Sequence, residues 1–157
     1  MPEPPARVVL AFDFGLRRIG IASGDTVSRS AAPRGAVFRA GGGIDWDSID
    51  RAIADLRPHL LIVGSPNHAD GSPGPLSDAA NRFAEALAQR SHLPVRRIDE
   101  YASSLEAAQE LKQQRARGQR RRRVQRADID SAAAAIILER WLNRDEAGAG
   151  DETGGDD

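Results

Sequence analysis

The sequence of 157 residues contains no cysteine, one lysine and only seven aromatic residues. Without cysteine the chain can form neither disulfides nor thiolate metal sites, and it is compatible with a reducing compartment. It also has no run of about 20 apolar residues that could cross a membrane, and its start lacks the apolar stretch of a secretory signal. These absences predict a cytoplasmic protein, and the low aromatic content argues against extensive stacking on nucleobases.

Charged residues are unevenly distributed along the chain. The net charge is -1, but the six acidic residues of segment 145–157 stand without a single basic residue. Residues 1–144 therefore hold 22 basic and 17 acidic residues, a net charge of +5. All basic residues except Lys112 are arginines, which suit forked contacts with phosphate, although GC-rich coding would enrich arginine as well. We expect one folded domain over residues 1–144 and a disordered acidic tail over 145–157.

Hydrophobic periodicity predicts an α/β fold. We expect strands at 7–14, 17–23, 35–38, 60–64 and 95–99, and helices at 44–56, 76–89, 103–115 and 128–143. The first three strands follow one another and should be antiparallel, whereas the later strands alternate with helices and should be parallel. The expected architecture is a five-stranded mixed sheet flanked by helices.

The helix predicted at 128–143 carries an acid on its apolar side. At 100° per residue Asp130 falls between Ile137 and Trp141, whereas Asp128 falls beside Glu139 on a polar flank. A carboxylate on a core-facing stripe needs a proton, a cation or a metal as partner. The simpler interpretation is an acid in the first helical turn, where the helix dipole favours negative charge.

Two further acids lie at strand ends. Asp13 interrupts an apolar strand in which aspartate is unfavourable, and Glu100 directly follows the strand predicted at 95–99. Asp13 could instead be a turn residue and Glu100 a solvated loop acid, with Asp99 as the functional one. If Asp13, Glu100 and Asp130 converge on one edge of the sheet, they form an arrangement that binds divalent metal ions.

Four segments resemble, in order, the motifs of the YqgF/RuvX nuclease family. They are FDFGLRRIGIA at 12–22, IVGSPNHADGS at 62–72, IDEYASS at 98–104 and DIDSAAAAIILERW at 128–141. The resemblance implies an RNase H-like fold and a phosphodiesterase that uses Mg²⁺ or Mn²⁺. It also assigns the metal-binding carboxylates to Asp13, Glu100 and Asp130. Tyr101 and Leu16 depart from the family pattern, in which arginine and threonine are usual at these positions.

Arginines near these motifs are candidates for binding nucleic-acid phosphates. Seven of them lie close together at 115–126. A run of this kind is commonly just a solvated or disordered stretch, but its position shortly before Asp130 favours phosphate contacts. The candidates are Arg17, Arg18, Arg120, Arg121, Arg122, Arg123 and Arg126.

The resemblance leaves two substrates open. One is the precursor of 16S ribosomal RNA, trimmed at its 5′ end during ribosome biogenesis; the other is a four-way DNA (Holliday) junction. We favour structured RNA, because resolving a junction needs a stable twofold dimer with an apolar self-complementary patch, which the sequence does not indicate. The expected form is a monomer or a weak homodimer. Two other functions are an actin-like or sugar-kinase-like ATPase, which would need a second domain, and a non-catalytic nucleic-acid-binding module.

Overall fold

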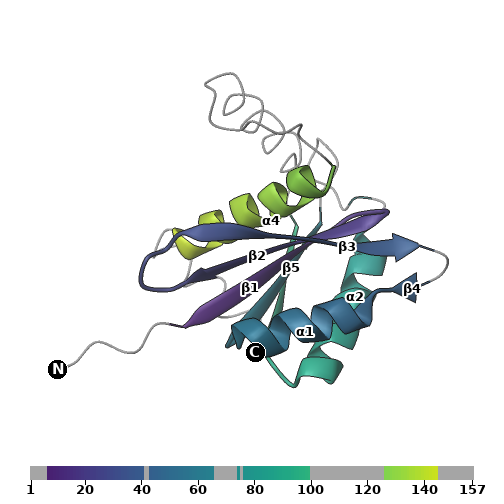
Figure 1. The fold of residues 1–157 in the computed structure, drawn as a ribbon, viewed down its shortest axis with the longest axis horizontal. Coiled ribbons are helices and arrows are strands. Elements are labelled where there is room, and N and C mark those ends of the chain that lie inside the picture. Colours follow the sequence, from purple (N-terminus) through teal and green to yellow (C-terminus); the bar gives the residue numbers. More distant parts are fainter. Residues whose placement is uncertain (1–6, 41–42, 66–73, 75, 100–125, 145–157) are drawn as a thin grey trace.

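A computed structural model describes the chain over residues 7–40, 43–65, 74, 76–99 and 126–144. These residues contain a six-stranded sheet with the strand order β4-β3-β2-β1-β5-β6. Figure 1 shows helices α1 and α2 on one face of this sheet and helix α4 on the other. The strands are β1 (Val8–Phe14), β2 (Arg18–Asp25), β3 (Ala31–Ala40), β4 (Gly43–Ile44), β5 (Leu60–Ser65) and β6 (Val95–Asp99); the helices are α1 (Trp46–Leu56), α2 (Ser77–Ser91) and α4 (Arg126–Leu142).

The predicted class and strand directions are confirmed. Strands β1, β2 and β3 pair antiparallel, and β5 and β6 run parallel to β1, as expected for an RNase H-like domain. The predicted strand count was wrong, because β3 is longer than expected and β4 pairs with its end at Arg39 and Ala40. Pro33 and Gly35 lie within β3, and both residue types argue against a strand when only the sequence is known. Proline is tolerated here because β4 pairs with only the end of β3, so most of that edge of β3 is open. The helix predicted at 103–115 lies outside the described residues.

Helix α1 has well-defined ends that agree with the sequence. Asp45 caps its start, with its carboxylate accepting a hydrogen bond from the Ser48 backbone N–H at 3.2 Å. Arg57 takes the left-handed conformation, with φ of 49°, and Pro58 follows it. No helix in the described segments is both long and apolar enough to cross a membrane.

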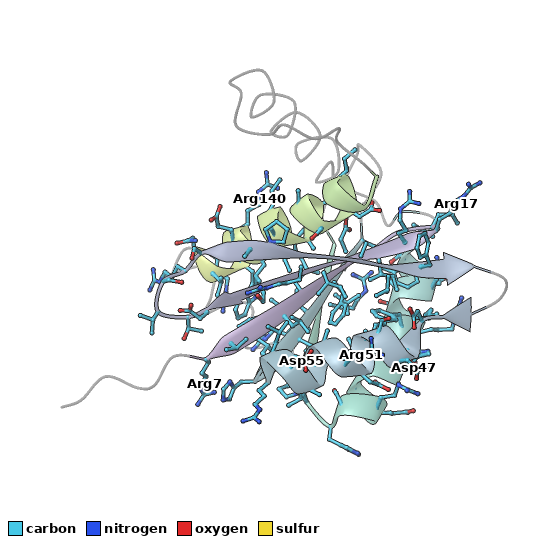
Figure 2. The ribbon with its side chains drawn as sticks, viewed as in Figure 1. Arg7, Arg17, Asp47, Arg51, Asp55 and Arg140 are labelled. Carbon is cyan, nitrogen blue, oxygen red and sulfur yellow. The ribbon has the colours of Figure 1, made fainter. Side chains whose placement is uncertain are left out.

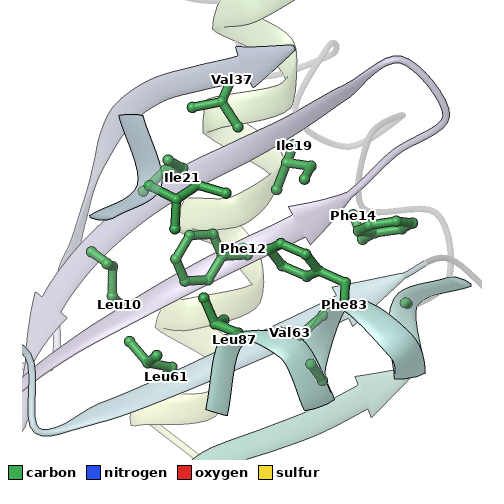
Figure 3. Packing of buried hydrophobic residues seen from close by; sticks show 13 residues of the cluster. Leu10, Phe12, Phe14, Ile19, Ile21, Val37, Leu61, Val63, Phe83 and Leu87 are labelled. Atoms are coloured by element: carbon green, nitrogen blue, oxygen red, sulfur yellow. The ribbon is translucent and has the colours of Figure 1, made fainter. Parts of the chain in front are cut away.

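The pleat of β1 separates two hydrophobic cores. Leu10, Phe12 and Phe14 point to the face covered by α1 and α2, which we call the aromatic face. There the centre of the Phe83 ring lies 5.7 Å from that of Phe12 (Figure 3). The Phe83 ring also stacks on Trp46, with 5.4 Å between the ring centres. The alternate residues of β1 point to the opposite face, which we call the α4 face. Its buried residues are Val9, Ala11, Ala22, Ile62, Ala134, Ile137, Leu138 and Leu142.

Candidate metal and nucleic-acid site

Asp13 lies near the carboxyl end of β1, in the middle of the sheet. It pairs with Gly20 of β2 on one side and with Gly64 of β5 on the other, so neither neighbour in the sheet covers it with a side chain. In the alternation of β1 it follows Val9 and Ala11, which places it on the α4 face. Asp13 is nevertheless only 7% exposed, and among the described residues it is the only buried one with an ionisable side chain.

The surroundings of Asp13 disfavour its negative charge. Burial, and then the neighbouring charge of Asp130, raise the pKa of the Asp13 carboxyl to about 7. Among the described residues no group donates a hydrogen bond to this carboxylate or forms an ion pair with it. A cation placed beside both acids would reverse this electrostatic penalty.

Asp130 reaches this position because α4 presses directly on β2. A Cβ atom added at Gly20 would overlap the backbone carbonyl of Asp130, so only glycine allows the helix to lie this close. The buried Ser131 fixes the contact: its hydroxyl donates to the Ile21 carbonyl at 2.9 Å and accepts from the Gly35 N–H at 2.8 Å. Asp13 pairs with Gly20 in the sheet, so the structure brings Asp13 and Asp130 to the same place.

Arg18 makes a contact that the sequence did not predict. Its Nε donates to Oδ2 of Asp130 at 2.7 Å, across 112 positions of sequence, and both side chains are about one-fifth exposed, at 19% and 24%. The sequence pattern proposed Arg18 only as a phosphate contact. Because Arg18 and Gly20 are two residues apart on one strand, they share the α4 face, and this spacing is the signal that could have indicated the pair.

The turn between β1 and β2 is held in place from β3. The Arg39 guanidinium donates to the carbonyls of Gly15 and Leu16, at 2.8 and 2.9 Å, and lies 4.3 Å from the centre of the Phe14 ring. Figure 2 shows Arg17 projecting away from the sheet at this end of the molecule. Along the outer side of α1, by contrast, Asp47, Arg51 and Asp55 mix both signs of charge, which makes that surface a poor binding face for a polyanion.

The parallel strands β5 and β6 end at the same edge of the sheet as β1. Ser65 is paired with Asp99 there, and Arg97 ties the edge to α2 by donating to Ser65 Oγ at 3.2 Å and to Asn81 Oδ1 at 2.7 Å. Glu100 directly follows β6 in the sequence but lies outside the described residues, as do the arginines at 120–123. Within the described ranges no three acidic or histidine side chains cluster as a metal site.

Comparison with known proteins assigns the family. The sheet with helices on both faces and the two carboxylates meeting on its α4 face define an α/β domain with a polar site at the carboxyl edge of its parallel strands. The profile of the RuvX family, described as Holliday junction resolvase, matches residues 7–144. The chain belongs to the RuvX family.

Curated relatives cover nearly the whole chain. A protein of Xanthomonas oryzae pv. oryzae (strain PXO99A) is 43% identical over 146 residues, covering 90% of this chain and 94% of that protein. Another, from Xanthomonas campestris pv. campestris (strain B100), is 42% identical over 150 residues, with coverages of 93% and 96%. Both are provisionally named pre-16S rRNA nucleases. The solved structure of T. thermophilus RuvC in complex with Holliday junction substrate shares 16% identity, with a TM-score of 0.49, and covers 87% of this chain and 93% of that one.

Proposed function

We propose that this protein is a divalent-metal-dependent nuclease that cleaves the precursor of 16S ribosomal RNA, acting in the cytoplasm. One observation carries the proposal: Asp13, buried in the central strand, faces Asp130 of α4 at the edge where the parallel strands end. The charge of Asp130 raises the pKa of Asp13, and Arg18 pairs with Asp130 alone, so the buried Asp13 carboxylate is left without a cation among the described residues. The names of the relatives, at 42 to 43% identity over most of the chain, support cleavage of ribosomal RNA as the reaction.

The residues present fit Mg²⁺ or Mn²⁺. Both ions prefer oxygen ligands, and the site offers two carboxylates, one of which carries a pKa raised by burial and by its neighbour. Asp13 and Asp130 would hold the metal, and Glu100, which follows the last residue of β6, is proposed as the third ligand. When bound, such an ion supplies an activated water and stabilises the negative charge that develops on the cleaved phosphodiester.

The protein's own contribution is rigid placement. Asp13 is fixed by strand pairing on both sides, and Asp130 by the contact with Gly20 and the bonds of Ser131. Placement of this kind matters because a displacement of about 1 Å can lower a reaction rate by roughly a hundredfold. Arg17, at the exposed turn, and the proposed run of Arg120, Arg121, Arg122, Arg123 and Arg126 would hold the phosphates of the substrate.

A four-way DNA junction is the alternative substrate, and the description of the family favours it. A resolvase makes paired cuts and so needs a twofold dimer. Exposed large apolar residues do occur in the described part, at Leu16, Val27 and Phe38, but Val27 lies at the opposite end of the β2 strand from the other two. A standard interface buries about 800 Å² on each partner, and three exposed apolar residues that do not form one patch are too few for a stable one. We therefore retain a monomer or weak homodimer.

The test compares cleavage of a labelled precursor fragment of 16S rRNA with cleavage of a mobile four-way junction, each titrated with Mg²⁺ and Mn²⁺. We expect metal-dependent cuts in the precursor. Asp130→Asn and Glu100→Gln should abolish cleavage, while the neighbouring Asp128→Asn serves as the matched control and should remain active. Symmetric cuts in the junction by a stable dimer, with the precursor left intact, would assign the alternative substrate; activity in chelator would reject the metal.

A further inference from the structure

The ion pair between Arg18 and Asp130 places a fixed cation on a carboxylate that is also proposed to bind a metal. Arg18 Nε lies 2.7 Å from Asp130 Oδ2. A divalent cation shared by Asp13 and Asp130 would lie a few ångströms from the same guanidinium. Like charges at that separation repel, and the partial burial of Arg18 and Asp130 reduces the screening by water. The guanidinium and the metal ion therefore compete for Asp130.

The Arg18 guanidinium could also bind a phosphate of the nucleic acid instead of Asp130. The backbone of Arg18 is held by the pairing of β2 with β1 and β3 and by the hydrogen bond from the Gly15 N–H to the Arg18 carbonyl at 3.0 Å, so only the side chain is free to move. The side chain is 19% exposed, which leaves the guanidinium within reach of a ligand in solution. A backbone phosphate offers the same forked arrangement of two oxygens as a carboxylate.

We propose that Arg18 couples metal binding to nucleic-acid binding: its guanidinium neutralises Asp130 until the substrate arrives, and transfers to a backbone phosphate when a divalent cation takes its place on Asp130. The inference rests on the proposed function, because it takes Asp130 to be a metal ligand. Arg18 acts in it as a positioning residue that keeps the metal site weak until a phosphate is present. By linkage, the metal and the nucleic acid each raise the affinity of the protein for the other.

A purely structural role makes the opposite prediction. If Arg18 served only to anchor the start of α4 on β2, removing its charge would loosen Asp130 and weaken metal binding. If Arg18 competes with the metal, removing its charge strengthens metal binding. Arg18→Gln separates these outcomes well, because glutamine keeps an N–H donor for Asp130 and lacks the charge.

The experiment measures Mn²⁺ affinity of the full chain by electron paramagnetic resonance of free Mn²⁺. In the absence of nucleic acid we expect Arg18→Gln to bind Mn²⁺ about fivefold more tightly or better, and Arg18→Lys to resemble the parent protein. Arg51→Gln is the matched control: it removes one positive charge from an exposed position on α1, and screening should limit its effect to less than about twofold. Equal gains in Arg51→Gln and Arg18→Gln would reduce the effect to net charge and overturn the inference.

A second arm repeats the titration with a 2′-O-methyl copy of the precursor fragment, which keeps the phosphates but resists cleavage. The fragment should raise the Mn²⁺ affinity of the parent protein by about fivefold or more, and that of Arg18→Gln far less. Thermal unfolding in chelator checks that each variant is folded. Unchanged or weaker Mn²⁺ binding in folded Arg18→Gln overturns the inference alone. Failure of the parent protein to bind Mn²⁺ under both conditions overturns the proposed function and the inference together.

Discussion

The two faces of the sheet are built from different kinds of residue. The aromatic face is filled by large side chains, among them Phe12, Phe14 and Phe83. On the α4 face the strands present mainly small residues, and the larger aliphatic side chains come mostly from the helix itself. Large buried side chains contribute about 1.5 to 3 kcal/mol each, and alanine much less. Both faces therefore stabilise the domain, but the small strand residues of the α4 face also allow a close approach between a helix and a strand.

The close approach has a chemical purpose in the proposed function. Helices packed through large side chains lie about 10 Å from their neighbours, too far for the backbone of a helix to touch a strand. Because glycine occupies position 20, the peptide of Asp130 rests on β2 beside the strand position of Asp13. Two acids from segments far apart in the sequence are thereby brought together.

The largest effect on cleavage is expected from Gly20→Ala. The added methyl group overlaps the Asp130 carbonyl, so α4 must move away from β2 by an appreciable fraction of an ångström or more. We expect cleavage to fall by roughly a hundredfold or more, since small misplacements are costly to catalysis. The free energy of unfolding should fall by about 1 to 3 kcal/mol, as for other overpacked sites. Cleavage kinetics and urea unfolding measure the two effects.

Gly43→Ala is the control for that experiment. A Cβ atom at Gly43 would meet nothing within 4 Å, so the same chemical change should leave cleavage and stability nearly unaltered. Full activity in Gly20→Ala would show that the contact between α4 and β2 is not required for the reaction.

Phe83→Ala should break the other face. Phe83 is 2% exposed and contacts the rings of Phe12, Phe14 and Trp46. Its truncation should lower the free energy of unfolding by about 3 to 5 kcal/mol, measured by urea denaturation. The molecules that remain folded should bind Mn²⁺ with unchanged affinity. Loss of Mn²⁺ binding by the folded variant would mean that the two faces are not independent.

The raised pKa of Asp13 predicts a pH dependence that belongs to the α4 face alone. Below pH 3.8 the group is protonated in both folded and unfolded chains and has no effect; between 3.8 and about 7 only the unfolded chain loses its proton. Without added metal, stability should therefore fall across this range, by up to roughly 4 kcal/mol, and Asp13→Asn should remove the loss. Chemical denaturation in chelator from pH 4 to pH 8 measures this loss in the parent protein and in Asp13→Asn. The prediction would be contradicted if the parent protein gained stability relative to Asp13→Asn as the pH rises.

The smallest effect is expected from Ser131→Ala. The substitution removes the hydroxyl that joins the Ile21 carbonyl to the Gly35 N–H through α4. The loss in unfolding free energy should be about 1 to 3 kcal/mol, with a lesser decrease in activity than in Gly20→Ala. Ser23→Ala is a suitable comparison, because Ser23 is also buried in β2 but accepts its hydrogen bond from Arg34, outside the α4 contact. Equal effects of the two substitutions on activity would argue against a role for Ser131 in placing Asp130.

Hydrophobic periodicity was sufficient to predict most of the fold. The apolar runs of β1 and β5 and the helical spacing of Ile49, Ile53 and Leu56 each correspond to an observed element. Most of strand β3 was missed because it is stabilised by pairing with β2, which the local sequence does not reveal. Pro33 and Gly35 by themselves indicate a turn.

The candidate site was harder to predict than the fold. Asp13 and Asp130 could be singled out because an acid in an apolar pattern is conspicuous in one sequence. The pair between Arg18 and Asp130 was missed, because the partner lies 112 residues away and the spacing of Arg18 and Gly20 becomes informative only once α4 is known to pack on β2. The predicted roles of Glu100 and of the arginines at 120–123 remain predictions.

Helix α4 touches β2 through a second glycine as well. A Cβ atom at Gly24 would lie 3.0 Å from Leu142 and 3.2 Å from Leu138, at the other end of the helix. Gly20 and Gly24 are separated by about 13 Å along the strand. Because α4 contacts β2 at both positions, the helix cannot tilt at one contact without losing the other. The angle at which Asp130 meets Asp13 is thus set partly by residues remote from the chemistry. Substitutions at Gly24 or Leu142 are accordingly expected to impair catalysis, although both residues lie at the end of the α4 contact opposite to Asp130.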